Sequence, residues 1–148
     1  MLTARLSLTL SSAPENAGLI CTLMRTFCEH AGLSPPPEAA RVELALAEAV
    51  NNAIQHTYQG KTGTEITIQT QIEAGYLRIE VHDQAQSLDL THEAAMPNPC
   101  QESGRGWPLM RTCVDRVDYR IDNAGNVLTL SKYLSVPKNL IKNHENNS

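Results

Sequence analysis

The sequence has no long apolar run and no long run of one charge. None of its hydrophobic stretches approaches the roughly 18 residues of a membrane-spanning helix, and no charged segment followed by an apolar block stands at its N-terminus. Basic residues never cluster beyond a pair, and the formal net charge is −4. These absences argue against a membrane span, a secretory leader and a nucleic-acid surface. We therefore expect a cytoplasmic protein.

Several common catalytic and metal-binding motifs are also missing. The four cysteines form no Cys-x-x-Cys pair, and Cys21 and Cys28 fall on one predicted helix face, so we interpret the cysteines as reduced core thiols. No His and Cys spacing suits a metal centre. The chain has no Gly-x-x-x-x-Gly-Lys-[Ser/Thr] loop, no His-Arg-Asp loop and no Gly-x-Ser-x-Gly elbow.

The composition is that of one globular domain. The 148 residues are 41% hydrophobic and 19% charged, which is ordinary for a chain that buries one sizeable core. We expect the domain to span residues 1–136. Residues 137–148 are polar and Asn-rich, so we expect them to form a flexible tail.

Hydrophobic periodicity predicts a mixed fold. Alternating residues indicate strands and a 3.6-residue period indicates helices. A capping box from Ser12 to Glu15 is expected to start the first helix, and Gly32 to end it. The segment between Asp83 and Gly106 shows little periodicity and is typical of a lid or binding loop. We predict strands at 2–10, 66–72, 77–81, 117–121 and 127–133, and helices at 12–31, 41–58 and 107–114, with a short helix at 88–95. This order predicts an α+β two-layer sandwich with helices on one face of a mostly antiparallel sheet.

The helix at 41–58 is the most informative stretch. Its apolar positions follow a helical stripe without a miss: Val42, Ala45, Leu46, Ala49, Val50, Ala53 and Ile54. Glu48, Asn52 and His56 form a second, polar stripe with a spacing of four. Such a stripe is commonly a solvated face, but Asn is disfavoured inside helices. An Asn oxygen suits Mg²⁺, and a Glu one turn away can orient or deprotonate a nucleophile.

Two further segments are compatible with a nucleotide site. Asp83 ends a strand, where a carboxylate can accept a hydrogen bond from an exocyclic amine such as that of adenine. Ser103-Gly104-Arg105-Gly106 opens the helix that starts at Trp107. The glycines allow the backbone to approach phosphate oxygens, and the first N–H groups of the helix point the same way. Each feature alone is weak, since strand-end Asp residues and Gly-x-Gly connections often serve only turns.

In combination these motifs resemble the Bergerat-fold ATPases, the superfamily of gyrase, the Hsp-type chaperone, histidine kinases and MutL. Within it, AEAVNNA at 47–53, SGRGW at 103–107 and the closing GNVLTLSKYL are similar to anti-sigma factor serine/threonine kinases of the RsbW type. The resemblance covers roughly residues 4–134 and implies the histidine kinase-like ATPase fold.

The resemblance implies roles for individual residues. Glu48 matches the catalytic base, Asn52 the magnesium ligand and Asp83 the adenine-recognising carboxylate. Further nucleotide-binding positions are then His56, Ala85, Ser87, Ser103, Gly104, Arg105, Gly106, Trp107 and Thr129. The implied cofactors are ATP and Mg²⁺. The implied partners are an anti-anti-sigma (STAS) protein that is phosphorylated, a sigma factor or other signalling protein that is sequestered, and a second copy in a homodimer.

One motif departs from the family. The family pattern is Asp-x-Gly-x-Gly, and this chain has Asp83-Gln84-Ala85-Gln86-Ser87. Glycine serves there where a base lies close to the backbone or φ is positive. Two main interpretations therefore stand: an ATP-dependent kinase, favoured by Glu48 with Asn52, and a binding module without turnover, favoured by the lost glycines. A small-molecule enzyme using the same pocket is a third.

Overall fold

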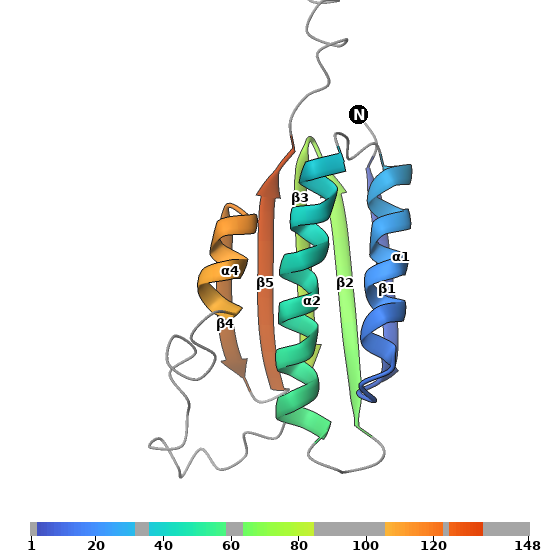
Figure 1. Ribbon diagram of the computed structural model, residues 1–148, viewed down its shortest axis with the longest axis vertical. Helices are drawn as coiled ribbons and strands as arrows, with labels where there is room; N and C mark the ends of the chain where they lie inside the picture. Colours follow the sequence, from blue (N-terminus) through green and yellow to red (C-terminus); the bar gives the residue numbers. More distant parts are fainter. Residues whose placement is uncertain (1–2, 32–35, 59–63, 85–105, 123–124, 135–148) are drawn as a thin grey trace, which may run out of the picture.

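The structure is a computed structural model that describes residues 3–31, 36–58, 64–84, 106–122 and 125–134 (Figure 1). Five strands, β1 (Ala4–Ser11), β2 (Glu65–Glu73), β3 (Tyr76–Asp83), β4 (Arg116–Asp122) and β5 (Gly125–Tyr133), form one antiparallel sheet in the order β1-β2-β3-β5-β4. The predicted helix at 88–95, most of the predicted lid, Cys100 and the predicted tail lie outside the described residues.

Within the described residues, three helices cover one face of this sheet. They are α1 (Asn16–His30), α2 (Pro36–Tyr58) and α4 (Gly106–Cys113), and Figure 1 shows α2 in the middle with α1 and α4 on either side. The arrangement confirms the predicted α+β two-layer sandwich. The order of the described elements, β-α-α-β-β-α-β-β, is also the predicted one.

The core lies between α2 and the central strands. The strand register aligns the rows that face the helices: Leu8 is opposite Ile68, Ile68 is opposite Val81, and Val81 is opposite Leu128. The predicted apolar stripe of α2 packs against these rows and is buried, since its seven residues are 0–6% exposed. Burial of this many aliphatic side chains, at roughly 1.5–3 kcal/mol each, is the main force that holds the layers together.

The turn between β2 and β3 is shorter than the gap between the predicted strands at 66–72 and 77–81. Glu73 pairs with Tyr76, so only Ala74 and Gly75 turn the chain. Both have positive φ, 50° and 77°, as a two-residue type I′ turn requires. The left-handed conformation at Ala74 costs about 1–2 kcal/mol, which the eight-pair ladder beside it offsets.

The start of α1 differs from the prediction. Glu15 caps the helix without a side-chain hydrogen bond, so the predicted capping box is wrong. Ser12 is buried, its N–H donates to the Thr64 carbonyl at 2.9 Å, and its hydroxyl shares a hydrogen bond with the Thr64 hydroxyl. The serine therefore ties the end of β1 to the start of β2.

The second helix is longer than predicted. It begins at Pro36 rather than Arg41, because proline ends a preceding helix but is well suited to the first turn of a new one. Cys21, Cys28 and Cys113 are free thiols, and the prediction of core positions is confirmed for Cys28 and Cys113, whereas Cys21 is only partly buried. Burial, with the nearby charge of Glu29, raises the pKa of Cys28 to about 11, so this thiol is unreactive at neutral pH.

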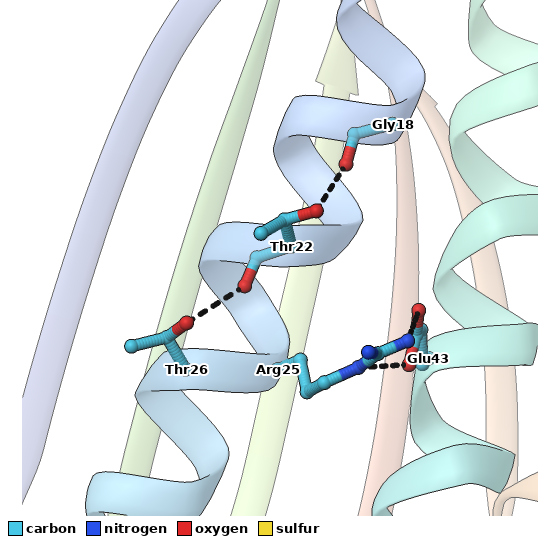
Figure 2. A network of polar contacts seen from close by, with 5 residues as sticks. All are labelled: Gly18, Thr22, Arg25, Thr26 and Glu43. Carbon is cyan, nitrogen blue, oxygen red and sulfur yellow. Dashed lines mark hydrogen bonds and ion pairs between the residues drawn. The ribbon is translucent and has the colours of Figure 1, made fainter.

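We predict that Gly18→Ala stabilises the protein. Gly18 lies in α1, where Thr22 donates a hydrogen bond to its carbonyl oxygen at 2.9 Å (Figure 2). A Cβ at this position would meet no atom within 4 Å. Alanine is the better helix former, so we expect a gain of about 0.5–1 kcal/mol. Thermal unfolding should show a rise of the midpoint of about 1–4 °C, and an unchanged or lower midpoint would contradict the open surroundings of Gly18.

Candidate functional site

Segments that are far apart in the sequence meet at one end of the sheet, at the bottom of Figure 1. There α2 reaches its C-terminal end, β3 ends at Asp83, β5 begins at Gly125 and α4 begins at Gly106. On the sheet, Asp83 lies opposite Asn126 of β5 and Ile66 of β2, and α4 packs against α2. The elements that carry the described candidate residues thus meet at one end of the sheet.

The polar stripe of α2 lies beside its buried stripe. Glu48 and Asn52 are partly exposed and one helical turn apart, whereas the neighbouring Asn51 is fully on the exposed side. His56 lies in the last turns of α2, and its side chain falls outside what the structure describes. A carboxylate and an amide oxygen therefore lie one helical turn apart on the same side of α2.

Asp83 is held by a side chain that the sequence patterns did not single out. The carboxylate is 6% exposed, and Asn126, which is 3% exposed, donates a hydrogen bond from Nδ2 to Oδ1 of Asp83 at 2.8 Å. This donor fixes the orientation of the Asn126 amide, because the opposite orientation would set two oxygens against each other. The Asn126 Oδ1 atom is buried and has no hydrogen-bond partner among the described residues.

Aromatic side chains of α4 and β4 pack beside this pair. Trp107 is buried and meets Tyr119 edge to face, with ring centroids 5.8 Å apart. Burial, and after it the negative charge of Asp83, raises the pKa of Tyr119 to about 12. Tyr119 therefore stays protonated at neutral pH. Gly106 is the buried first residue of α4, and its helix presents N–H groups without intrahelical partners at that end.

Gly125 lets β5 approach β3 closely at the site. Its φ is +131°, and a Cβ there would stand 2.2 Å from the Asp83 carbonyl oxygen and 3.2 Å from the Gln84 Cα. Only glycine adopts this conformation without strain. Because Asn126 follows directly, Gly125 also sets the position of the side chain that bonds Asp83.

The predicted site residues divide into three groups. Glu48, Asn52, His56, Asp83, Gly106 and Trp107 lie on elements that meet at this end of the sheet. Thr129 lies on β5 as well, but on the face away from the helices, because it alternates with Leu128 and Leu130, which face them. The positions Ala85, Ser87, Ser103, Gly104 and Arg105 lie outside the described residues.

Asn126 and Gly125 are site residues that the sequence reading missed. Both fall in the gap between the predicted strands at 117–121 and 127–133. The signal available in the sequence was the period of two in β5, which places Asn126 in phase with Leu128 and Leu130 on the helix face. A polar residue in phase with a buried row is a candidate for a specific role.

The side-chain oxygens of Asn52, Asp83 and Asn126 fit a nucleotide bound together with magnesium. Within the described ranges, no group of three or more His, Cys, Asp or Glu side chains is arranged to hold a metal ion. Mg²⁺ does not need such a cage, since it is usually held by one or two protein oxygens, waters and substrate phosphates. The Asn52 oxygen can supply such a ligand. Asp83 and the unpartnered Asn126 oxygen are acceptors for an amine-bearing base.

An antiparallel sheet with helices on one face, and with these candidate residues on the elements that meet at one end, is the fold of Bergerat-type ATPases. The chain belongs to the histidine kinase-like ATPase domain family, whose model matches residues 10–132.

Its relatives in sequence have similar lengths. The serine-protein kinase RsbW of Bacillus licheniformis is 27% identical over 148 aligned residues, which cover 90% of this chain and 91% of that protein. An anti-sigma F factor of a Thermoanaerobacter strain is 28% identical, with 92% of this chain and 98% of that protein covered. The chain is thus similar to RsbW-type proteins along nearly its whole length.

Solved structures share the fold. The RsbU and RsbW domains of a Mycobacterium tuberculosis protein match with a TM-score of 0.68 at 21% identity, covering 90% of this chain and 33% of that one. The histidine kinase domain of a blue-light activated kinase from Erythrobacter litoralis matches with a TM-score of 0.57 at 20% identity, covering 86% and 64%. In the part of the chain that the structure describes, no helix is long and apolar enough to cross a membrane.

Proposed function

We propose that this chain is an ATP- and magnesium-dependent protein serine/threonine kinase that also binds a sigma factor. In this proposal it phosphorylates an anti-anti-sigma (STAS) protein within a partner-switching module. It acts in the cytoplasm as a homodimer, without direct contact to nucleic acid or membrane. The RsbW and anti-sigma F relatives support this proposal. The observation that carries it is the pairing of Glu48 with Asn52 on α2, the helix whose C-terminal end lies at the end of the sheet where Asp83 is buried.

Each residue has a defined task in this proposal. ATP supplies the phosphoryl group. Glu48 accepts the proton of the Ser or Thr hydroxyl that is phosphorylated, and Asn52 provides an oxygen to Mg²⁺. Asp83 accepts a hydrogen bond from the adenine amine, while Asn126 holds the Asp83 carboxylate in place.

The phosphate side of the site comes from the chain before α4. In the proposal Gly104, Arg105 and Gly106 follow the phosphates, and the free N–H groups at the start of α4 face them. Arginine suits this place because its guanidinium forms paired hydrogen bonds with phosphate oxygens.

A second candidate function is a binding module of the same fold that regulates its partner by protein contacts alone. The sequence observation that favours it is the presence of Ala85 and Ser87 where the family has glycine. A methyl group against the base or a strained φ weakens nucleotide binding without removing the acceptors on Asp83. The kinase proposal is favoured because a pure binding module has no use for Glu48 and Asn52 together.

A thermal-shift series distinguishes the two functions and tests the missing glycines. With magnesium-ATP in excess, ligand at 100 times its dissociation constant stabilises by about 2.7 kcal/mol, and each kcal/mol raises the midpoint by about 2–4 °C. We expect a clear rise for the wild type and a larger one for Ala85→Gly with Ser87→Gly, because one clash or strained residue is worth roughly 1–3 kcal/mol. No shift in either protein would eliminate the kinase proposal and leave the binding module.

A further inference from the structure

On the face of the sheet away from the helices, a groove follows β5. Its floor consists of the short side chains of β5 that alternate with the helix-facing leucines, which are Val127, Thr129 and Ser131. Its walls are longer side chains of the two neighbouring strands, among them Arg78 of β3 and Arg116, Asp118 and Arg120 of β4. The groove has a volume of about 360 Å³, which is at the lower end of the range of small-molecule sites.

The floor of the groove is buried, although in the described part of the chain all three helices pack on the other face of the sheet. Val127 is 5% exposed and Ser131 is 4% exposed, because taller side chains stand on both sides of them. Among the described residues, the Ser131 carbonyl accepts the Asp115 N–H, but the Ser131 hydroxyl has no hydrogen-bond partner. The groove therefore offers a buried donor in a place that is sheltered from water, where polar contacts are stronger.

The walls of the groove concentrate positive charge. Arg78, Arg116 and Arg120 are three of the eight arginines in a chain whose formal net charge is −4. Among the described residues that line the groove, Asp118 is the single acidic one. The groove is therefore positive in a protein that is negative as a whole, and such a local excess of charge attracts small anions.

Two of these arginines flank Ser131 and keep most of their donors. Arg78 lies opposite Ser131 on β3, and Arg116 lies opposite it on β4. The Nη2 atom of Arg78 donates to Oε1 of Glu80 at 3.2 Å. The Nε atom of Arg116 lies 2.7 Å from Oδ2 of Asp118. A guanidinium has five N–H groups, so each carboxylate orients its arginine and still leaves N–H groups for a ligand.

We propose that this groove binds a phosphate group, held between Arg78 and Arg116 above the Ser131 hydroxyl. The Cα atoms of the two arginines are two strand spacings apart, about 9–10 Å, so both side chains can reach one group over Ser131. Guanidinium groups form paired hydrogen bonds with phosphate oxygens, and the hydroxyls of Ser131 and Thr129 add neutral donors. The volume suits inorganic phosphate or a small phosphorylated molecule rather than an acidic polypeptide.

The proposed phosphate site is separate from the candidate nucleotide site. Thr129 and Ser131 lie on one face of β5, whereas Asn126 is in phase with the leucines on the face that the helices cover. The resemblance assigned Thr129 to the nucleotide, but in the structure this residue lines the groove instead. The inference goes beyond the proposed function and does not depend on it.

Titrations of the full chain, followed by ¹H–¹⁵N NMR at constant ionic strength, test the site. The probes are inorganic phosphate and ribose 5-phosphate, and sodium chloride is the control. Saturable shifts are expected at the amides of Thr129 and Ser131 and at the Nε–H signals of Arg78 and Arg116. Tighter binding of ribose 5-phosphate would assign the groove to a larger phosphorylated molecule, and equal or weaker binding would assign it to free phosphate. No saturable shift, shifts that sodium chloride reproduces, or shifts confined to the surroundings of Asp83 would overturn the inference.

Substitutions separate a built site from a general effect of charge. Arg78→Gln and Arg116→Gln should each raise the phosphate dissociation constant about tenfold, because each removes charge-assisted hydrogen bonds. Arg5→Gln is the matched control, since Arg5 lies on the same face but on β1, at the far edge of the sheet from β4 and beyond the range of a screened charge. Its dissociation constant should equal that of the wild type, and equal effects of all three substitutions would overturn the inference.

Ser131→Ala tests the position of the phosphate without changing any charge. The variant should bind phosphate more weakly than the wild type, and an unchanged dissociation constant would contradict a phosphate group held above Ser131. The NMR spectrum of each variant shows directly whether its fold is retained. A magnesium-ATP thermal shift on Arg116→Gln should match that of the wild type, so a failure of the groove and a failure of the nucleotide site are distinguishable.

Discussion

Replacing Glu48 with alanine is expected to lower phosphate transfer by a factor of about 10² to 10⁴, the usual contribution of a positioned general base. Nucleotide binding and partner binding should remain, because in the proposed site Glu48 faces the acceptor hydroxyl and does not contact the phosphates or the base. The helix should also remain, since alanine is the strongest helix former and Glu48 is only partly buried.

The measurement is transfer of labelled phosphate from ATP to a STAS protein that the wild type phosphorylates. Glu43→Ala is the matched control, because Glu43 is on the same helix but bonds Arg25 of α1. Its rate should equal that of the wild type. Full transfer by the Glu48 variant would show that Glu48 is a solvated helix residue and not the base.

Gly125→Ala is expected to be the most destabilising substitution considered for this fold. The added Cβ would lie 2.2 Å from the Asp83 carbonyl oxygen, and φ at Gly125 is +131°. Strain and displacement of backbone together should cost about 2–5 kcal/mol, which lowers the unfolding midpoint by roughly 5–20 °C. Nucleotide affinity should fall too, because Asn126 and Asp83 would separate.

Chemical or thermal unfolding of Gly125→Ala and Gly18→Ala, side by side, makes this prediction specific. The substitution is the same, but the two glycines differ in backbone conformation and in the space around the added Cβ, so the expected effects have opposite signs. A Gly125 variant as stable as the wild type would mean that β3 and β5 do not approach as closely as the structure shows.

Features set by neighbouring residues were predictable from the sequence. The stripe of α2 and the alternation of β2 and β3 are local patterns, and they predicted the elements, their order and the buried face. The gap between the predicted strands at 66–72 and 77–81 also located the hairpin turn, which the structure narrows to Ala74 and Gly75.

Features that depend on distant pairing were not predictable. Ser12 and Glu15 have the spacing of a capping box, but the Ser12 hydroxyl is hydrogen-bonded to the hydroxyl of Thr64, 52 residues away. The bond from Asn126 to Asp83 spans 43 residues and exists only because β3 pairs with β5. Thr129 was assigned to the site from the resemblance, although its phase in β5 points it to the other face. Strand phase is therefore the better guide to which polar residues can share a site.

The most direct test of the account is a titration of ATP into the wild type, Asn52→Ala and Asn51→Ala, each with and without Mg²⁺. Asn51 is the exposed neighbour of Asn52 on α2 and serves as the matched control. We expect the wild type and the Asn51 variant to bind ATP more tightly with Mg²⁺ than without it, and the Asn52 variant to lose this difference. Wild-type protein that binds no nucleotide, or an Asn52 variant with an unchanged magnesium effect, would contradict the assignment of this end of the sheet as an ATP site.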